Sequence, residues 1–423
     1  MSWFASSSAT GPNLHPVQLN FPDQNSLFGP LVQADTEWQC AGGMGPTETQ
    51  VFYHTQKDGS LVMVQVIHSS VGMWYPQIQF QFRYCNPQTN TNIFKSVSVS
   101  NFSTAPSSKL DKRSCKADQF SITLDPATPN KYTVEGKFDN DVQVSFVYEA
   151  LTPGFKVGAG PKGGFTYFGQ LSAKPAKGDA PDTQAGADGY AIHRVWPRCK
   201  VTGIVRIGND VTDVDGSRGI FIHAIQGMRP NLLAAKWNFA NFQSLGDDGV
   251  ALFMMEFTTP PAYGSKVINI GSVVVGDRLV AVTTGGSGVA GGSSATHESP
   301  IKDKETGYEA PSAIKFVWEG VKLEGQDSQL EAVKGAKVHA VLTEDLVTKA
   351  EGYETRGLVE KVDVLGHIPY LVRKFVNYAA GTKPYIYTWL NPVKASVTIS
   401  NGTETKTIDA EGLIFNEATF ISS

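Results

Sequence analysis

The sequence predicts an all-β protein in which two antiparallel β units pack against one another. Many short segments alternate apolar and polar residues, as strands with one buried face do. Turn residues separate these segments, and glycine supplies 42 of the 423 residues, about a tenth, against a usual share of about 7%. The length fits two β units of roughly 200 residues each, and 41% hydrophobic residues are enough to fill their cores.

The first β unit begins with a hairpin. The segment TQVFYHTQ leads into the turn Asp58-Gly59, and SLVMVQVIHSS returns from it. The next segment, PQIQFQFRY at 76–84, alternates as a half-buried strand does. Further strand-like segments lie at 92–102, 119–124, 131–138 and 141–151. Evenly spaced short strands are typical of a barrel or a sandwich.

The second β unit begins near Val195. Its strand-like segments lie at 200–207, 219–225, 250–260, 267–275, 278–284, 314–323, 337–342, 383–390, 394–399 and 412–421. A short helix is expected near the C-terminus over 369–380, because Pro369 suits the first helical position and Gly381 supplies a stop.

Three parts are therefore expected along the chain. Residues 1–33 are rich in Ser, Asn and Pro without periodicity, which indicates a flexible N-terminal arm. The first β domain is expected over 34–194 and the second over 195–423.

Charge and composition argue against several classes of protein. The chain has 36 Lys and Arg residues against 40 Asp and Glu residues, with no basic cluster, so nucleic-acid binding is not expected. Residues 1–30 lack the pattern of a secretory signal, and no apolar run has the length of a membrane span. The four cysteines form no CxxC pair, and the glycine-rich strings lie in loops, so we expect no metal and no cofactor.

Glu256 is the most unusual ionisable residue, because it lies in the apolar strand LFMMEFTTPP. A buried carboxylate is costly without a partner, so the sequence predicts a structural ion pair with Arg194 or Arg198, and Lys236 is a further candidate. A catalytic acid is the alternative. The same choice applies to His68 and His223, which end apolar strands; a structural role is predicted for both.

The block FIHAIQGMRPNLLAAKWNFANF at 221–242 mixes large apolar side chains with a few polar ones. This combination is typical of a pocket for an apolar ligand, but a packing seam between the two β units explains it equally well. The ligand-binding candidates are Trp196, Met228, Trp237, Phe239, Phe242 and Phe257. Trp196 and Trp237 also suit an extensive, rigid seam.

Beyond residue 33 the chain contains, in this order, the stretches TEWQC, ETQVFYHT, HRVWPR, AIQGMRP, AAKWNFANF, MEFTTPP and TKPYIYTW. In these stretches and in their order the chain resembles the fungal survival-factor proteins, and AIQGMRP and MEFTTPP are the most specific matches. Proteins of that family are linked to survival of oxidative stress and are built from two lipocalin-like domains.

This resemblance implies two packed lipocalin-like β-barrels and a binding protein rather than an enzyme. It implies a sphingolipid ligand, with ceramide as the first candidate, that is moved between endoplasmic reticulum and Golgi membranes. The implied location is the cytoplasm, with peripheral association at those membranes, and the nucleus as a further location. An apolar cavity alone can hold such a lipid, because burying each CH₂ group contributes about 0.8 kcal/mol.

The family also implies a membrane anchor at the N-terminus. Here Trp3 and Phe4 are the only apolar candidates for membrane contact, and SSSATGP follows them without a basic residue. We therefore expect weak, peripheral contact. The alternative function is an enzyme, because similar double lipocalin-like folds serve as hydratases or cyclases of isoprenoids or polyketides; Glu256, His68 or His223 would then act as acid or base.

Overall fold

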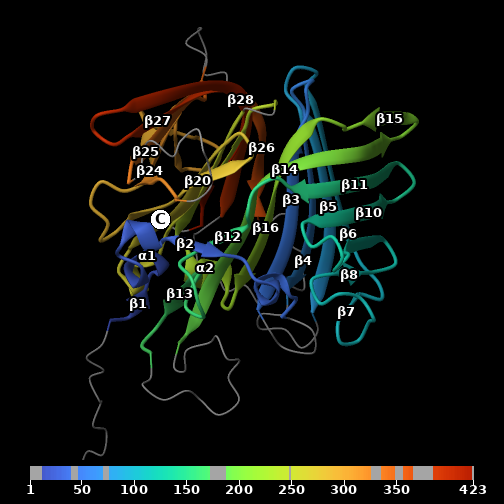
Figure 1. Cartoon of the computed structure of the whole chain (residues 1–423). Helices are drawn as coiled ribbons and strands as arrows, with labels where there is room; N and C mark the ends of the chain where they lie inside the picture. The colour runs from blue at the N-terminus through green and yellow to red at the C-terminus, as the bar shows by residue number, and fades with distance from the viewer. Residues whose placement is uncertain are drawn as a thin grey trace, which may run out of the picture.

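The computed structural model describes residues 12–39, 46–69, 76–171, 187–246, 249–324, 335–347, 356–364 and 384–421. Two large sheets lie side by side, the first towards the right and the second towards the left of Figure 1. The predicted all-β, lipocalin-like class is confirmed: the first sheet forms a half-barrel and the second a nearly closed barrel. The predicted C-terminal helix at 369–380 lies outside the described residues.

The first sheet is antiparallel and follows one path through most of its strands. The path runs through β6 (Thr91–Ser98), β5 (Gln77–Asn86), β4 (Leu61–Ser69), β3 (Thr47–Thr55), β16 (Ser217–Gln226), β14 (Gly189–Ile207), β11 (Val142–Ala150), β10 (Lys131–Phe138), β9 (Phe120–Leu124), β8 (Cys115–Lys116) and β7 (Ser103–Thr104). Shorter strands extend it: β1 (Leu14–His15), β2 (Phe28–Pro30), β12 (Phe155–Val157), β13 (Phe165–Phe168) and β15 (Asp210–Asp213). The predicted hairpin is present as β3 and β4.

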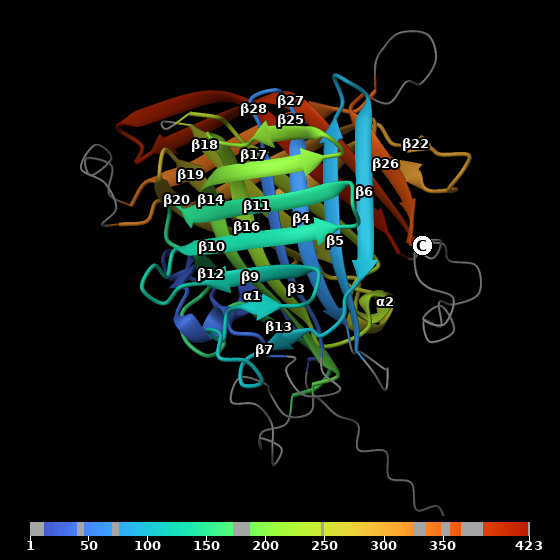
Figure 2. The same cartoon turned by 90° about the vertical axis from the view of Figure 1, so that its right-hand side faces the viewer.

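This sheet folds over on itself, so that β9, β10 and β11 cross in front of β3, β4 and β5 (Figure 2). The ring of Phe80 on β5 stacks on Phe138 of β10 with 4.2 Å between the centroids. The long strand β14 has a register shift between Trp196 and Cys199, around Pro197. Proline cannot donate to a ladder, and a bulge is one of the few places where a sheet accepts it.

The second sheet is also antiparallel. It runs through β20 (Arg278–Gly286), β19 (Val267–Val275), β18 (Val250–Thr258), β17 (Lys236–Gln243), β28 (Thr405–Phe420), β27 (Tyr385–Ser400), β25 (Lys337–Asp345), β24 (Ala313–Val321) and β21 (Ser294–Glu298), and β26 (Leu358–Asp363) pairs with β27. The backbone N–H of Leu323, just after β24, donates to Val280 of β20 at 2.8 Å, which brings the two ends of the path together.

The remaining elements are short. They are α1 (Val17–Asn20), α2 (Pro230–Leu233), the 3₁₀ turns η1 (Gln24–Ser26), η2 (Gln33–Thr36) and η3 (Pro261–Tyr263), and the strand pair β22 (Ile301–Lys302) with β23 (Glu309–Ala310).

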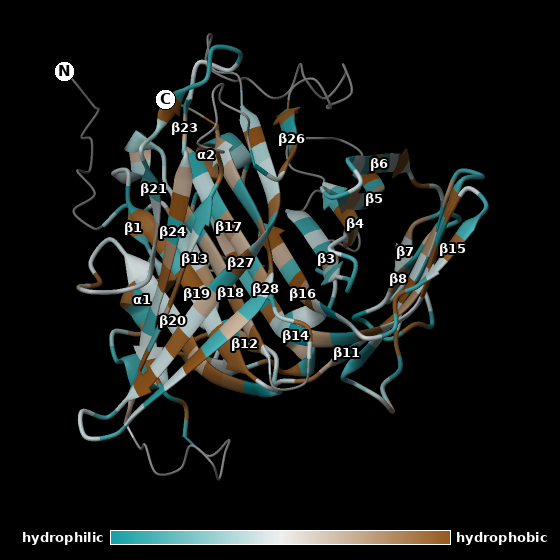
Figure 3. Cartoon of the chain, turned by 90° about the horizontal axis from the view of Figure 1, so that it is seen from above, coloured by the Kyte–Doolittle hydropathy of each residue, from teal (hydrophilic) through white to brown (hydrophobic). Residues whose placement is uncertain are grey.

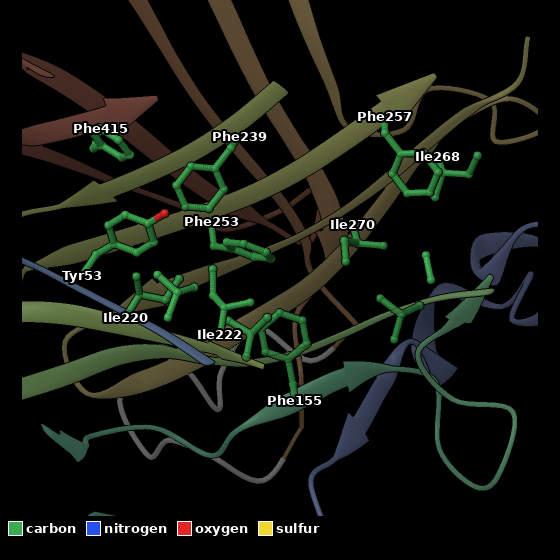
Figure 4. Close-up of a cluster of buried hydrophobic side chains, with 14 of the residues drawn as sticks. Tyr53, Phe155, Ile220, Ile222, Phe239, Phe253, Phe257, Ile268, Ile270 and Phe415 are labelled. Atoms are coloured by element: carbon green, nitrogen blue, oxygen red, sulfur yellow. The ribbon is translucent and has the colours of Figure 1, made fainter. Parts of the chain in front are cut away.

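Three large apolar clusters hold the molecule together. One fills the fold of the first sheet, and another fills the second barrel. The third lies between the sheets and takes side chains from both; we call it the seam cluster, and Figure 4 shows part of it. Viewed from above, brown and teal residues alternate along many strands, as in strands that present one apolar and one more polar face (Figure 3). On β17, Phe239 belongs to the seam cluster and Phe242 to the second barrel's core.

The domain boundaries differ from those expected. The boundary placed between 194 and 195 falls inside β14, and the chain changes sheet only between Gln226 and Lys236. Part of the expected arm is also packed: β1 pairs with β13, β2 pairs with β12, and Val17 and Leu27 are buried. These differences arise because strand pairing depends on tertiary contacts that local composition does not report.

Candidate functional site

A pocket of about 470 Å³ lies between the two sheets, within the size range of ligand sites. Its walls come from β3, β4, β5, β6 and β16 of the first sheet and from β17, β26, β27 and β28 of the second. The apolar lining includes Tyr53, Met63, Phe94, Trp237 and Phe415. The polar lining includes Gln65, Gln79, Gln81, Arg83, Glu360 and Glu417.

Strand alternation produces this lining. On β5, Phe80 and Phe82 point into the core of the first sheet, so Gln81 and Arg83 point to the opposite face, where the second sheet lies. On β28, Ile414 packs in the second barrel while Phe415 lines the pocket.

The apolar wall is built around Tyr53 on β3. Its ring lies 5.6 Å from Phe239 and 5.4 Å from Phe415, which come from β17 and β28, and Figure 4 shows the three rings facing one another. Burial raises the pKa of the Tyr53 phenol well above its ordinary value, so the phenol stays neutral. Trp237 lies beside these rings in the lining.

Two polar contacts join the sheets at one side of the pocket; we call them the edge latch. Arg83 Nη2 on β5 contacts Glu360 Oε2 on β26 at 2.7 Å. Asn92 Nδ2 on β6 donates to the carbonyl oxygen of Val359 at 3.1 Å. Arg83 also donates to Asn92 Oδ1 at 3.2 Å and lies over the ring of Phe94 at 5.0 Å, so three neighbouring side chains hold its guanidinium in place.

Another depression, of about 660 Å³, lies over β9, β10, β11 and β14. It is the larger of the two, but charged side chains such as Asp118, Glu135, Lys137 and Arg206 line it. The pocket between the sheets suits an apolar ligand better, because several aromatic side chains line it, whereas Phe120 is the one aromatic residue among those described in the lining of this surface.

The predicted ligand-binding residues are spread over all three clusters. Trp237 lines the pocket, and Phe239 packs directly behind it against Tyr53. Met228 and Phe257 lie elsewhere in the seam cluster. Trp196 packs against Tyr132 and Phe221 in the first core. Phe242 lies in the second core. Trp3 and Phe4, the expected membrane contacts, lie outside the described residues.

Glu256 is buried as predicted, but its partners are amides rather than arginines. Asn269 Nδ2 donates to it at 2.9 Å, Asn238 Nδ2 at 3.3 Å, and the backbone N–H of Ala295 at 3.1 Å. Burial raises the pKa of Glu256, and these hydrogen bonds and nearby Lys236 oppose that shift.

The two arginines instead anchor other parts of the junction. Arg194 Nε lies 3.1 Å from Asp35 Oδ1, which also accepts from Lys156 Nζ at 2.7 Å. Arg198 donates to the carbonyl oxygens of Ser244 at 3.2 Å and Gly246 at 2.6 Å, beside the β17–β18 turn. Arg198 therefore connects β14 of the first sheet to the second sheet.

The two histidines lie in the first core. His223 Nε2 lies 2.7 Å from Glu48 Oε1, and both side chains are fully buried. His68 is the cross-strand neighbour of Glu48, and burial lowers its pKa. The sequence did not pair His223 with Glu48; the enzymatic alternative, which would use these histidines, stays a prediction.

The sequence missed most of the pocket's polar wall. Gln79, Gln81 and Arg83 alternate with phenylalanines, and this pattern is also that of a strand with a solvent-facing side. Two features of the sequence could have indicated a covered face: the length of the alternation and the apolar segment that forms β4 beside it. Only the position of the second sheet in the structure shows that this face is covered.

No helix in the described part of the chain is long and apolar enough to span a membrane. Within the same ranges, no group of three or more His, Cys, Asp or Glu side chains is arranged to hold a metal ion.

Comparison with known proteins gives consistent results. The model of the Svf1 family matches residues 3–422. The ceramide-binding protein svf1 of Aspergillus fumigatus is 32% identical over 421 residues, covering 94% of this chain and 92% of that protein. The ceramide-binding protein SVF1 of Debaryomyces hansenii is 33% identical, covering 97% and 93%. The crystal structure of CghA with Sch210972 matches with a TM-score of 0.56 at 9% identity, over 97% of this chain and 98% of that one, which supports the fold.

Proposed function

Because the chain belongs to the Svf1 family, we propose that it binds a neutral long-chain lipid of the ceramide class in the pocket between its two sheets. The aromatic wall of that pocket is the observation that carries the proposal. The names of the relatives supply the lipid class.

Physical chemistry supports this ligand class. Alkyl chains gain about 0.8 kcal/mol for each CH₂ group removed from water, and Tyr53, Trp237 and Phe415 offer broad apolar faces for such contacts. The pocket also carries amide and hydroxyl groups, such as those of Gln65, Gln79 and Thr388, which can bond the amide and hydroxyls of a ceramide head.

The proposal extends to transport. A lipid whose chains lie between the sheets is shielded from water, which lets the chain carry it through the cytoplasm between endoplasmic reticulum and Golgi membranes. Contact with those membranes is peripheral and weak, and the role in the cell is survival of oxidative stress. The family resemblance supports this part.

Filling the pocket tests the binding site. Ala224 is half-buried in the pocket wall, and Ala224→Trp places an indole in the space that the lipid would use. We expect at least about a tenfold loss of affinity for a fluorescent ceramide, since about 1.4 kcal/mol is lost when one or two buried methylenes are displaced. Transfer of that probe between donor and acceptor vesicles should slow in parallel.

The matched control is Ala127→Trp, the same change at an exposed turn. Circular dichroism confirms the fold of both variants. Unchanged ceramide binding by a folded Ala224→Trp protein would show that the lipid binds elsewhere. A wild-type protein that copurifies with no lipid and takes up no ceramide would remove the proposed function.

A further inference from the structure

The described lining of the pocket between the sheets contains more carboxyl groups than cations. The charged residues in this described lining are Arg83, Glu360 and Glu417. Arg83 is engaged by Glu360 at 2.7 Å, by Asn92 at 3.2 Å and by the face of Phe94. Among the described lining residues, the one cation is therefore paired with one carboxylate, and Glu417 adds a second carboxyl.

Glu417 lies in the wall formed by β28, two residues from Phe415. Its neighbours across the ladders are Phe239 on β17 and Thr388 on β27, neither of which titrates. The ionisable groups that face it from the opposing elements are Tyr53 on β3, Arg83 on β5 and Glu360 on β26. Among the described residues, no hydrogen bond or ion pair to another side chain satisfies its carboxyl, so the group remains available to a ligand.

Building on the proposed function, we propose that Glu417 makes the pocket select uncharged lipids over anionic ones. The hydroxyl or amide N–H of a neutral head group can donate to the Glu417 carboxylate, and such charge-assisted hydrogen bonds are strong. A lipid carboxylate or phosphate would instead meet a like charge at short range, and the charge of the nearby guanidinium is already paired with that of Glu360. Specificity of this kind arises as much from repulsion of the wrong ligand as from attraction of the right one.

This selection against anionic lipids, which we call the charge filter, should depend on pH. Burial raises the pKa of Glu417 to about 7, while Arg83 opposes the shift. Above that pH the carboxyl is ionised and repels an anionic head; below it the carboxyl is protonated and the repulsion is lost. Affinity for an anionic lipid should therefore rise as the pH falls from 8 to 6, whereas affinity for a matched neutral lipid should not rise, because protonation also weakens its charge-assisted hydrogen bond to Glu417.

Two fluorescent probes with the same C16 chain test this, one a sulfonate, which stays ionised from pH 8 to 6, and the other its primary sulfonamide, which is uncharged there. At pH 8 the full-length wild-type protein should bind the sulfonamide at least about tenfold more tightly than the sulfonate, a difference of about 1.4 kcal/mol. Glu417→Gln keeps the volume and removes the charge, so it should reduce this preference to within about twofold and abolish its pH dependence. Glu411→Gln, the same change at an exposed position of β28, should behave as wild type.

The outcomes separate the two proposals. Equal binding of both probes by wild type at pH 8, or an unchanged preference in Glu417→Gln, would overturn the charge filter and leave lipid binding intact. A wild-type protein that binds neither ceramide nor either of the two probes would overturn the proposed function together with the filter. If Glu417→Gln does not fold, the wild-type titration from pH 8 to 6 decides: a constant preference refutes the filter, and a preference that falls with pH supports it.

Discussion

At the scale of single residues, Glu344 shows how a buried carboxyl affects stability. Its side chain is fully buried at the end of β25, and Asn391 Nδ2 donates to Oε1 at 2.7 Å. Burial raises the pKa of Glu344 from an ordinary 4.5 to about 8. Between these two values the folded state keeps a proton that the unfolded chain releases, so the free energy of unfolding falls as the pH rises through this window.

Glu344→Gln should remove that dependence, because the amide never ionises and its Oε1 can still accept from Asn391. Relative to wild type, we expect the variant to gain more than about 1 kcal/mol of stability on going from pH 5 to pH 8. Urea denaturation at both pH values measures this, with Glu404→Gln at an exposed turn as the control. If the variant and wild type differ in free energy of unfolding by the same amount at pH 5 and pH 8, the raised pKa of Glu344 would be contradicted.

The burial of a residue was easier to predict from the sequence than the identity of its hydrogen-bond partners. The apolar strand around Glu256 identified it as a buried carboxyl, and the structure agrees. Its partners Asn238 and Asn269 are its direct neighbours on the two flanking strands. Such neighbours depend on strand register, which the sequence of one strand does not contain. Charge complementarity alone favours Arg194 and Arg198, and it carries no information about strand register.

At the scale of elements, the edge latch closes one side of the pocket between β5, β6 and β26. The Arg83–Glu360 contact is only partly shielded, since Glu360 is 27% exposed. Glu360→Gln should therefore cost less than about 1 kcal/mol of stability. Its main effect should be on ligand exchange, because the sheet edges then separate more easily.

We expect the rate of ceramide dissociation from Glu360→Gln to rise up to about fivefold, the factor that 1 kcal/mol provides. Stopped-flow displacement of a fluorescent ceramide measures it. Asp139→Asn, which breaks the exposed Lys95–Asp139 pair on the same sheet, is the control. Identical dissociation rates for the two variants would mean that the ligand leaves by another side of the pocket.

The strands themselves were largely predictable, but their sheet membership was not. Alternation located the segments that became β14 and β16, yet the sequence assigned them to the second domain. Alternation reports that one face of a strand is buried and does not report which strand lies beside it. With a bulge at Pro197, β14 pairs with β16 along most of its length. On its other edge β14 pairs with β13 before the bulge and with β11 after it, so it joins two parts of the first sheet.

At the scale of the whole molecule, the seam cluster makes the two sheets interdependent. Its members include Tyr53 and Phe155 from the first sheet and Phe253 and Phe415 from the second. We expect fragments 1–228 and 229–423 to melt without cooperativity when expressed separately, because each exposes its share of this cluster, and to form a folded complex when expressed together.

Fragments 1–194 and 195–423 are the comparison, because that cut divides β14 and should give much less complex. Calorimetry of the purified fragments and of the coexpressed pairs distinguishes these results. Sharp melting of 1–228 and 229–423 on their own, without affinity for one another, would show that the sheets are independent domains.

The position of the pocket also links ligand binding there to the stability of the whole protein. Its walls come from both sheets, so a molecule bound there is released when the sheets separate. Ligand at 100 times its dissociation constant then adds about 2.7 kcal/mol to the free energy of unfolding. Proteases act on opened chains, so we expect them to clear the empty form faster than a ligand-bound form.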